Sequence, residues 1–225
     1  MVETLDLCPE VRHFVFDVPE VEALTFTAGQ FVSFSETLGG RSVTRAYSIA
    51  SAPDGNRFEL CLNRVQDGVF SPHLFAMKPG EEVDMKGPLG YFVLRNPGRD
   101  AVFVATGTGI APFRSMLKAH LGVGPHQQYT LVFGVRYEAN LLYREEFEAL
   151  ERQHPNFRFW PTISRPDEGW SGRRGRVQAH LAEALGEDRN VDVYICGMRE
   201  MVDEVRSLLK GFGLDRRQII FEKYD

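Results

Sequence analysis

The sequence predicts a two-domain protein of the β plus α/β class, with an antiparallel β-barrel followed by a doubly wound domain built on a parallel sheet. Three observations lead to this prediction. Short strand-like segments separated by turns fill residues 1–97, apolar strands alternate with amphipathic helices over 98–225, and a turn-rich break lies at 96–100. A chain of 225 residues is long enough for two such domains to bury a core each.

The first domain is expected to consist of short strands, because β-branched and aromatic residues dominate segments that Gly or Pro turns separate. These segments are 2–7, 11–16, 30–35, 46–50, 57–65 and 82–85. Many short strands at regular spacing are typical of an antiparallel barrel. One helix is expected among them, with Ser71 as its N-cap and Pro72 as its first helical residue.

The second domain is expected to alternate strands with helices, the pattern of a parallel sheet covered on both faces. The expected strands are 101–105, 129–135, 157–164, 191–196 and 218–221, and the expected helices are 112–121, 142–153, 176–185 and 199–210. Such sheets bind ligands beyond the carboxyl ends of their strands, so the residues that follow each strand are the first candidates for a site.

Composition excludes several classes of function. A net charge of −5 argues against a non-specific nucleic-acid binder, and no stretch has the length of a membrane span or the pattern of a secretory leader. A soluble cytoplasmic protein, a monomer or weak dimer, is expected. Cys8, Cys61 and Cys196 are too few for an all-cysteine iron–sulfur cluster and lack the spacing of a metal site. Cys8 and Cys61 are expected to be small buried core residues.

A glycine-rich turn, Thr106-Gly107-Thr108-Gly109-Ile110-Ala111-Pro112, follows the first expected strand of the second domain. Glycines let a ligand approach the backbone, and the start of the helix offers free N–H groups and positive potential to a phosphate. The spacing is Gly-x-Gly-x-x-Pro, which is neither the Gly-x-Gly-x-x-Gly fingerprint nor a P-loop. An ordinary strand-to-helix turn is therefore the alternative.

The ends of the later strands also carry candidate residues, most of them small or cationic. They are Gly134, Arg136, Ser164, Arg165, Cys196, Gly197 and Met198. Because parallel strands end at one edge of the sheet, these residues predict a dinucleotide site there. In the first domain, Arg45-Ala46-Tyr47-Ser48 can hold a second anionic ligand, since a guanidinium fork suits a phosphate, although a surface ion pair is the alternative for Arg45. Two such sites in order predict two cofactors that meet, and hence electron transfer.

Five short motifs occur in the order of a known family: Arg45-Ala46-Tyr47-Ser48, Gly68-Val69-Phe70-Ser71, Gly107-Thr108-Gly109-Ile110-Ala111-Pro112, Cys196-Gly197 and Phe221-Glu222-Lys223-Tyr224. Through them the chain resembles the ferredoxin–NADP⁺ reductase superfamily over essentially its whole length. Within that superfamily it looks most like bacterial ferredoxin reductases and the reductase portion of oxygenases.

The resemblance implies that residues 1–97 bind a flavin, FAD in preference to FMN, and that residues 98–225 bind NAD(P)H. Tyr47 would pack on the flavin, Arg45 would pair with its phosphate, and Ser48 would act near flavin N5. The remaining flavin contacts would come from Ala46, Asn63, Arg64, Val65, Gly68, Val69, Phe70 and Ser71. The alternatives are an ordinary N-cap for Ser71 and a solvated charge for Arg64.

On the nucleotide side, the resemblance places Cys196 beside nicotinamide C4 and makes Ser48, Cys196 and Glu222 the catalytic residues, although a buried structural cysteine is the alternative. Either Tyr224 or Phe221 would stack on the flavin. The other nucleotide contacts would be Thr106, Gly107, Thr108, Gly109, Pro112, Arg136, Ser164, Arg165, Arg174, Gly197 and Met198. Arg165 and the cluster around Arg174 favour NADPH over NADH, with a solvated basic loop as the alternative.

The expected function is hydride transfer between NAD(P)H and FAD, followed by single-electron transfer to a separate ferredoxin or flavodoxin. Two alternatives stay open. One is an NADH-linked reductase component of a multicomponent oxygenase. The other is a non-catalytic flavin- and nucleotide-binding subunit, although the C-terminal cysteine cluster of such subunits is missing from the sequence given.

Overall fold

The computed structural model describes residues 1–123, 127–187 and 189–224. The chain forms two compact units, one made of Met1–Leu94 with Ala111–Ala119 and the other of Arg95–Ile110 with His120–Asp225. Nearly all of helix α2 (Ala111–His120) therefore packs with the first unit, although it follows the first strand of the second. Each unit has a hydrophobic core of its own.

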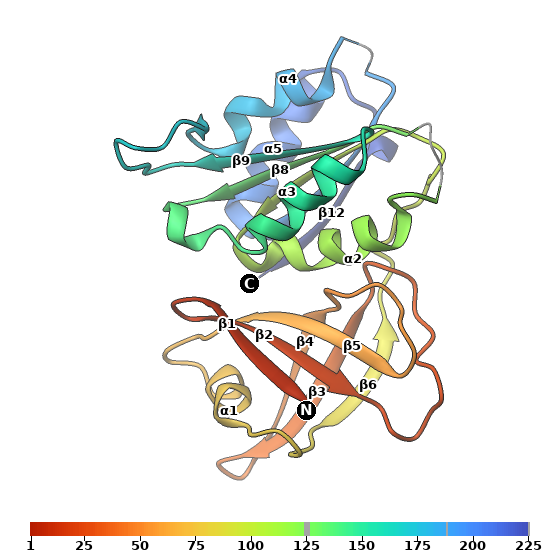
Figure 1. Cartoon of the computed structure of the whole chain (residues 1–225), viewed down its shortest axis with the longest axis vertical. Coiled ribbons are helices and arrows are strands. Elements are labelled where there is room, and N and C mark those ends of the chain that lie inside the picture. The colour runs from red at the N-terminus through yellow and green to blue at the C-terminus, as the bar shows by residue number, and fades with distance from the viewer. Residues whose placement is uncertain (124–126, 188, 225) are drawn as a thin grey trace. The chain divides into compact units, whose positions relative to one another are not determined.

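The first unit holds six strands in two antiparallel sheets of three (Figure 1). One sheet has the order β1-β2-β5, formed by Glu3–Cys8, Val11–Asp17 and Arg57–Asn63. The other has the order β4-β3-β6, formed by Arg41–Ser48, Phe31–Leu38 and Asp84–Leu89. A bridge between Ile49 and Leu60 joins the end of β4 to β5, and Phe14, Phe34 and Phe58 lie in one shared core. The predicted antiparallel β domain is confirmed.

All the strands of this unit differ in bounds from the ranges that the sequence predicted, and two of them differ the most. The strand expected over 46–50 is β4, Arg41–Ser48, because a tight turn at Gly39 and Gly40, both with positive φ, starts its pairing with β3 directly at Leu38. The strand expected over 82–85 is β6, Asp84–Leu89, because its pairing with β3 continues as far as Leu89. Cross-strand pairing therefore moved both boundaries.

Two local predictions in the first unit were wrong. Helix α1 spans Phe70–Ala76 with Val69 as its N-cap, so Ser71 is not the cap. The Ser71 hydroxyl instead accepts a hydrogen bond from the backbone N–H of Val65 at 2.9 Å and closes the preceding loop. Cys61 is buried as expected, but Cys8 is only half-buried because it ends β1 at an irregular pair with β2.

The second unit is built on a six-stranded parallel sheet of order β10-β9-β8-β7-β11-β12, which confirms the predicted α/β domain. In that order the strands are Arg173–Arg174, Phe157–Ile163, Tyr129–Val135, Ala101–Thr106, Asp192–Met198 and Ile219–Tyr224. Helices α4 (Leu181–Leu185) and α5 (Arg199–Gly211) cover one face, and α3 (Arg144–Gln153) covers the other (Figure 1). Val104, Ile195 and Val205 belong to the core under α5.

The largest differences from the predicted helices lie at helix starts. The helix expected over 176–185 begins as a 3₁₀ turn, η3 (Val177–His180), and only Leu181–Leu185 is α-helical. The helix expected from 142 starts at Arg144, because Tyr143 has a φ of 54° and cannot be part of it. A 3₁₀ turn, η1 (Gly107–Ile110), likewise precedes α2. In the part of the chain that the structure describes, no helix is long and apolar enough to cross a membrane.

Candidate functional site

In the first unit, the predicted flavin segment lies at the end of β4. The Arg45 side chain is exposed, and among the described residues it donates only to the neighbouring carbonyl of Thr44, at 2.8 Å, so its remaining donors can take a ligand. The half-buried Tyr47 ring lies beside Phe34 and Phe70, with centroids 5.8 Å and 6.2 Å away. Burial raises the pKa of Tyr47 to about 12, against a smaller lowering by Arg45, so the phenol stays neutral. Ser48 is buried.

The loop between β5 and α1 supplies an exposed apolar surface in the same unit. Val65 and Val69 are 55% and 59% exposed, which is high for aliphatic side chains. Asn63 and Arg64 are exposed as well, and Phe70 is buried beneath Tyr47. A planar apolar ring would remove the two valines from water, so this loop fits the flavin that the sequence predicts.

In the second unit, the glycine-rich turn begins where β7 ends. The Thr106 hydroxyl is buried and has no hydrogen-bond partner among the described residues. A buried polar atom without a partner is costly, and a bound polar group relieves that cost. The chain packs closely around this hydroxyl because Gly109 and Gly197 have no side chain. A Cβ on Gly109 would lie 2.7 Å from the carbonyl carbon of Cys196, and Gly197 has a φ of 146°, which only glycine adopts easily.

Cys196, Glu222 and Tyr224 come together on one face of the neighbouring strands. In the parallel register Cys196 pairs with Glu222, and Met198 pairs with Tyr224. Burial raises the pKa of the Cys196 thiol well above its usual range, and Glu222 raises it further, while a hydrogen bond with the Tyr224 side chain lowers it by less. The thiol is therefore neutral, and it can shape a pocket without acting as a nucleophile.

Phe221 lies on the opposite face of β12 from Tyr224. The Arg206 guanidinium of α5 lies 3.7 Å from the Phe221 ring centroid, and Lys223, on the same face, pairs with Asp203 of α5 at 2.7 Å. Side chains alternate along a strand, so Phe221 and Tyr224 cannot both face the Cys196 thiol. The structure groups Tyr224 with Cys196 and separates Phe221 from them.

The predicted cationic residues at the sheet edge are exposed, but they are not alike. Arg165 donates to the hydroxyl of Tyr137 at 3.4 Å, and Arg174 donates to the carbonyl of Trp170 at 2.6 Å. Arg173 forms two hydrogen bonds with Glu183 and stacks on Trp160 at 3.7 Å. The basic cluster is thus partly ordered, since Arg173–Arg174 forms the short strand β10 and not the solvated loop that the sequence left as the alternative.

The other predicted residues at this edge differ in exposure. Five of them are exposed or half-buried: Gly107, Thr108, Arg136, Ser164 and Met198. The exposed fraction of Met198 is 65%. Ala111 and Pro112 are buried at the start of α2, which packs with the first unit. An unpartnered hydroxyl, narrow glycine positions and exposed cations at successive strand ends fit a dinucleotide.

Sequence reasoning missed a buried polar network in the first unit. Arg114 of α2 is 5% exposed, forms a close ion pair with Glu59 of β5 and donates to the carbonyl of Ala50 at 2.9 Å. Ser115 donates to the carbonyl of Ser51 at 2.5 Å. Arg114 and the other contacts lower the pKa of the Glu59 carboxyl against its burial. An arginine within the apolar run from Ile110 to Leu117 was the available signal.

Family profiles match both units. The profile of the oxidoreductase FAD-binding domain covers residues 1–94, and that of the oxidoreductase NAD-binding domain covers residues 103–207.

Among full sequences, ferredoxin–NADP reductase B of Sorangium cellulosum is 43% identical over 235 residues, covering 100% of this chain and 96% of the relative. The reductase component of phenol 2-monooxygenase from Pseudomonas sp. strain CF600 is 32% identical over 231 residues, covering 98% of this chain but 63% of the relative. The chain therefore spans nearly the whole of the first relative and less than two thirds of the second.

Among solved structures, a ferredoxin NADP⁺ reductase from Neisseria gonorrhoeae with bound FAD and NADP superposes with a TM-score of 0.84 at 27% identity. The match covers 99% of this chain and 96% of the other. The similarity therefore extends over both units.

Proposed function

The chain belongs to the ferredoxin–NADP⁺ reductase superfamily, and from this premise we propose that it passes electrons from NADPH through FAD to a separate ferredoxin or flavodoxin. Membership itself makes the protein an NAD(P)H-dependent flavoprotein oxidoreductase. The observation that carries the proposal is the buried Thr106 hydroxyl, which has no partner in the described part of the chain and lies at the sheet edge that also holds the cluster of Cys196, Glu222 and Tyr224.

FAD would be held by residues 1–97, with the boundary to the nucleotide domain at 97/98. When bound, the flavin supplies hydride acceptance and release of electrons one at a time. Arg45 would neutralise a flavin phosphate with the donors that Thr44 leaves open. Tyr47 would pack against the ring as a neutral phenol, and Val65 and Val69 would lose their exposure to water. Ser48 would orient the ring edge.

NAD(P)H would bind along the carboxyl edge of the parallel sheet. The Thr106 hydroxyl would hydrogen-bond the nucleotide, and Gly109 and Gly197 would let the glycine-rich turn and β11 pack closely around that hydroxyl. Cys196 would line the nicotinamide pocket as an uncharged thiol, because its raised pKa keeps the proton on the sulfur. We assign the aromatic that covers this site to Tyr224 and not to Phe221, since Tyr224 shares a hydrogen bond with Cys196.

The preference for NADPH rests on Arg165 and Arg174. Both are exposed, and each has donors in addition to the one that binds the Tyr137 hydroxyl in Arg165 or the Trp170 carbonyl in Arg174. A 2′-phosphate could therefore take additional bonds from them. Arg173 is a poorer candidate, because Glu183 and Trp160 already hold it.

A second candidate function is the reductase component of a multicomponent oxygenase. The 32% identity to the phenol 2-monooxygenase reductase component favours it, and an NADH preference would accompany it. A non-catalytic flavin-binding subunit is a third reading, in which the flavin binds but pyridine nucleotide does not reduce it.

Anaerobic stopped-flow reduction of the FAD-loaded protein separates these readings. The proposal expects NADPH to bleach the flavin absorbance faster than NADH at equal concentration, and the reduced protein to reoxidise on mixing with a ferredoxin or flavodoxin. Faster reduction by NADH would favour the oxygenase component. Flavin binding without bleaching by either nucleotide would identify a non-catalytic subunit.

A further inference from the structure

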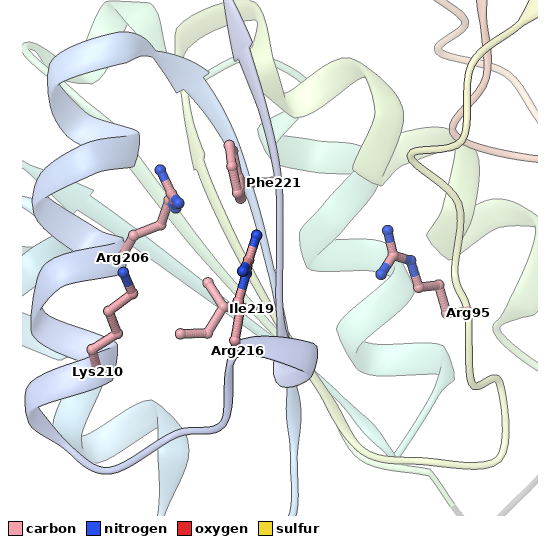
Figure 2. A pocket seen from close by; sticks show the side chains of 6 residues that line it. All are labelled: Arg95, Arg206, Lys210, Arg216, Ile219 and Phe221. Atoms are coloured by element: carbon pink, nitrogen blue, oxygen red, sulfur yellow. The ribbon is translucent and has the colours of Figure 1, made fainter.

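A basic pocket lies beside the edge strand of the second unit (Figure 2). Its volume is about 220 Å³, and it is lined by Arg95, Arg206, Lys210, Arg216, Ile219 and Phe221. Ile219 and Phe221 project from the face of β12 that packs toward α5, the face opposite to Glu222 and Tyr224. Except for Phe221, the lining residues do not belong to the predicted flavin or nucleotide sites.

Three separate segments of the chain bring the cations to this pocket. Arg206 and Lys210 lie one turn apart on α5, Arg95 precedes β7, and Arg216 lies in the 3₁₀ turn η4 (Arg216–Gln218) (Figure 2). Backbone contacts hold two of these segments in place. The Arg95 N–H donates to the Tyr194 hydroxyl at 2.9 Å, and a capping box formed by Asp215 and Gln218 orders the turn.

The positive charge in the pocket is only partly compensated. Arg206 forms an ion pair with Asp203 at 3.1 Å, but the same carboxylate also forms an ion pair with Lys223. Over the ranges 1–123, 127–187 and 189–224, the side chains of Arg95, Lys210 and Arg216 form no hydrogen bond or ion pair. Cations that lie close together repel one another when few counter-charges are present. Binding of an anion among them therefore lowers the free energy.

We propose that this pocket binds a compact polyanion of the phosphate class, such as pyrophosphate or a small phosphate ester. Guanidinium groups match phosphate oxygens in pairs, and a lysine adds a point charge. The volume exceeds the roughly 30 Å³ of one water but stays below the roughly 300–1,000 Å³ of pockets for drug-sized ligands. Ile219 and Phe221 give the pocket an apolar floor, on which an ester group can pack.

The test is a calorimetric titration of the FAD-loaded 225-residue chain with inorganic pyrophosphate at low ionic strength. Saturating NADP⁺ is present, so that the predicted dinucleotide site is already filled. The expected result is one equivalent of bound pyrophosphate. Lys210→Gln and Arg216→Gln should each raise its dissociation constant about tenfold, the effect of removing one hydrogen bond to a charged group.

Arg217→Gln is the matched control, because Arg217 is the exposed neighbour of Arg216 and does not line the pocket. It should leave pyrophosphate binding unchanged. The proposal is overturned if the unsubstituted protein binds no pyrophosphate, or if all three variants bind it equally. Tighter binding of citrate would overturn the phosphate assignment in favour of a carboxylate. Tighter binding of a hexaglutamate peptide would overturn it in favour of an acidic protein surface.

Discussion

The predicted dinucleotide edge and the basic pocket are two regions of one unit to which we assign anionic ligands, and they are built in different ways. The edge consists of closely packed backbone at Gly109 and Gly197 and of the buried hydroxyl of Thr106. In the pocket, long cationic side chains from three chain segments surround an apolar floor. A site made of backbone should fail when a methyl group is added, whereas a site made of side-chain charge should fail when charge is removed.

The largest effect is expected for Gly109→Ala. Its Cβ would overlap the backbone of Cys196, so the turn or β11 must shift. We expect kcat/KM for NADPH to fall about 100-fold, the cost of a displacement of about 1 Å at a reacting centre. Stopped-flow flavin reduction measures this, with Gly211→Ala as the control, since nothing lies within 4 Å of a Cβ there. Unchanged reduction by the Gly109→Ala protein would refute a backbone-built site.

A smaller and selective effect is expected for Arg165→Gln combined with Arg174→Gln. Loss of both guanidinium groups should lower kcat/KM for NADPH about tenfold and leave that for NADH unchanged, because NADH has no 2′-phosphate. Steady-state dye reduction with each nucleotide measures the ratio. Arg176→Gln removes an exposed cation of the same cluster and serves as the control. Equal losses with both nucleotides would show that these arginines act on structure and not on nucleotide choice.

Cys196→Ala is expected to leave the pH dependence of flavin reduction unchanged in shape from about pH 6 to pH 9. Burial raises the pKa of the thiol, so the neutral form persists as pH rises through this window and no thiolate forms. Rates measured across the window in both proteins provide the check. A rise in rate near pH 8 that disappears in the variant would mean that the edge site uses a thiolate after all.

The smallest effect is expected for Arg216→Gln in the absence of ligand. Removing one of the clustered cations should stabilise the fold by about 0.3 kcal/mol at low salt, and the gain should vanish in about 0.5 M salt as charges are screened. Urea denaturation at the two salt concentrations measures the difference. Arg217→Gln should show no such gain. A loss of stability on Arg216→Gln would contradict the view that these cations repel one another.

Much of the fold was predictable, because strand and helix periodicity is local. The β8 strand, Tyr129–Val135, has the predicted bounds, and α5 differs from its prediction by one residue at its C-terminus. Errors fell where a tertiary contact decides the boundary. The start of β4 depends on its pairing with β3, and Arg173–Arg174 is a strand only because it pairs with β9. Pairing partners remote in sequence leave no periodic signal.

Part of the candidate site was predictable for the same reason. The contiguous motifs around Tyr47 and Gly109 predict bound ligands from the types of residue that they contain. The grouping of Cys196 with Tyr224, in contrast, follows from the register between β11 and β12, and that register separates Phe221 from them. The sequence left these two aromatics as alternatives, because strand alternation puts them on opposite faces, but only the pairing of β12 with β11 decides which face is shared with Cys196.

By itself, the sequence determined the two-domain class, the family and the residues that follow each strand. The class follows from the periodicity of apolar residues, and the family and the strand-end residues follow from short contiguous motifs. Only the tertiary structure decided that α2 packs with the first unit through Arg114 and Glu59, that the Thr106 hydroxyl is buried with no partner among the described residues, and that four cations line one pocket. The physical reason is that burial and convergence are properties of distant segments brought together, which no local pattern of residues encodes.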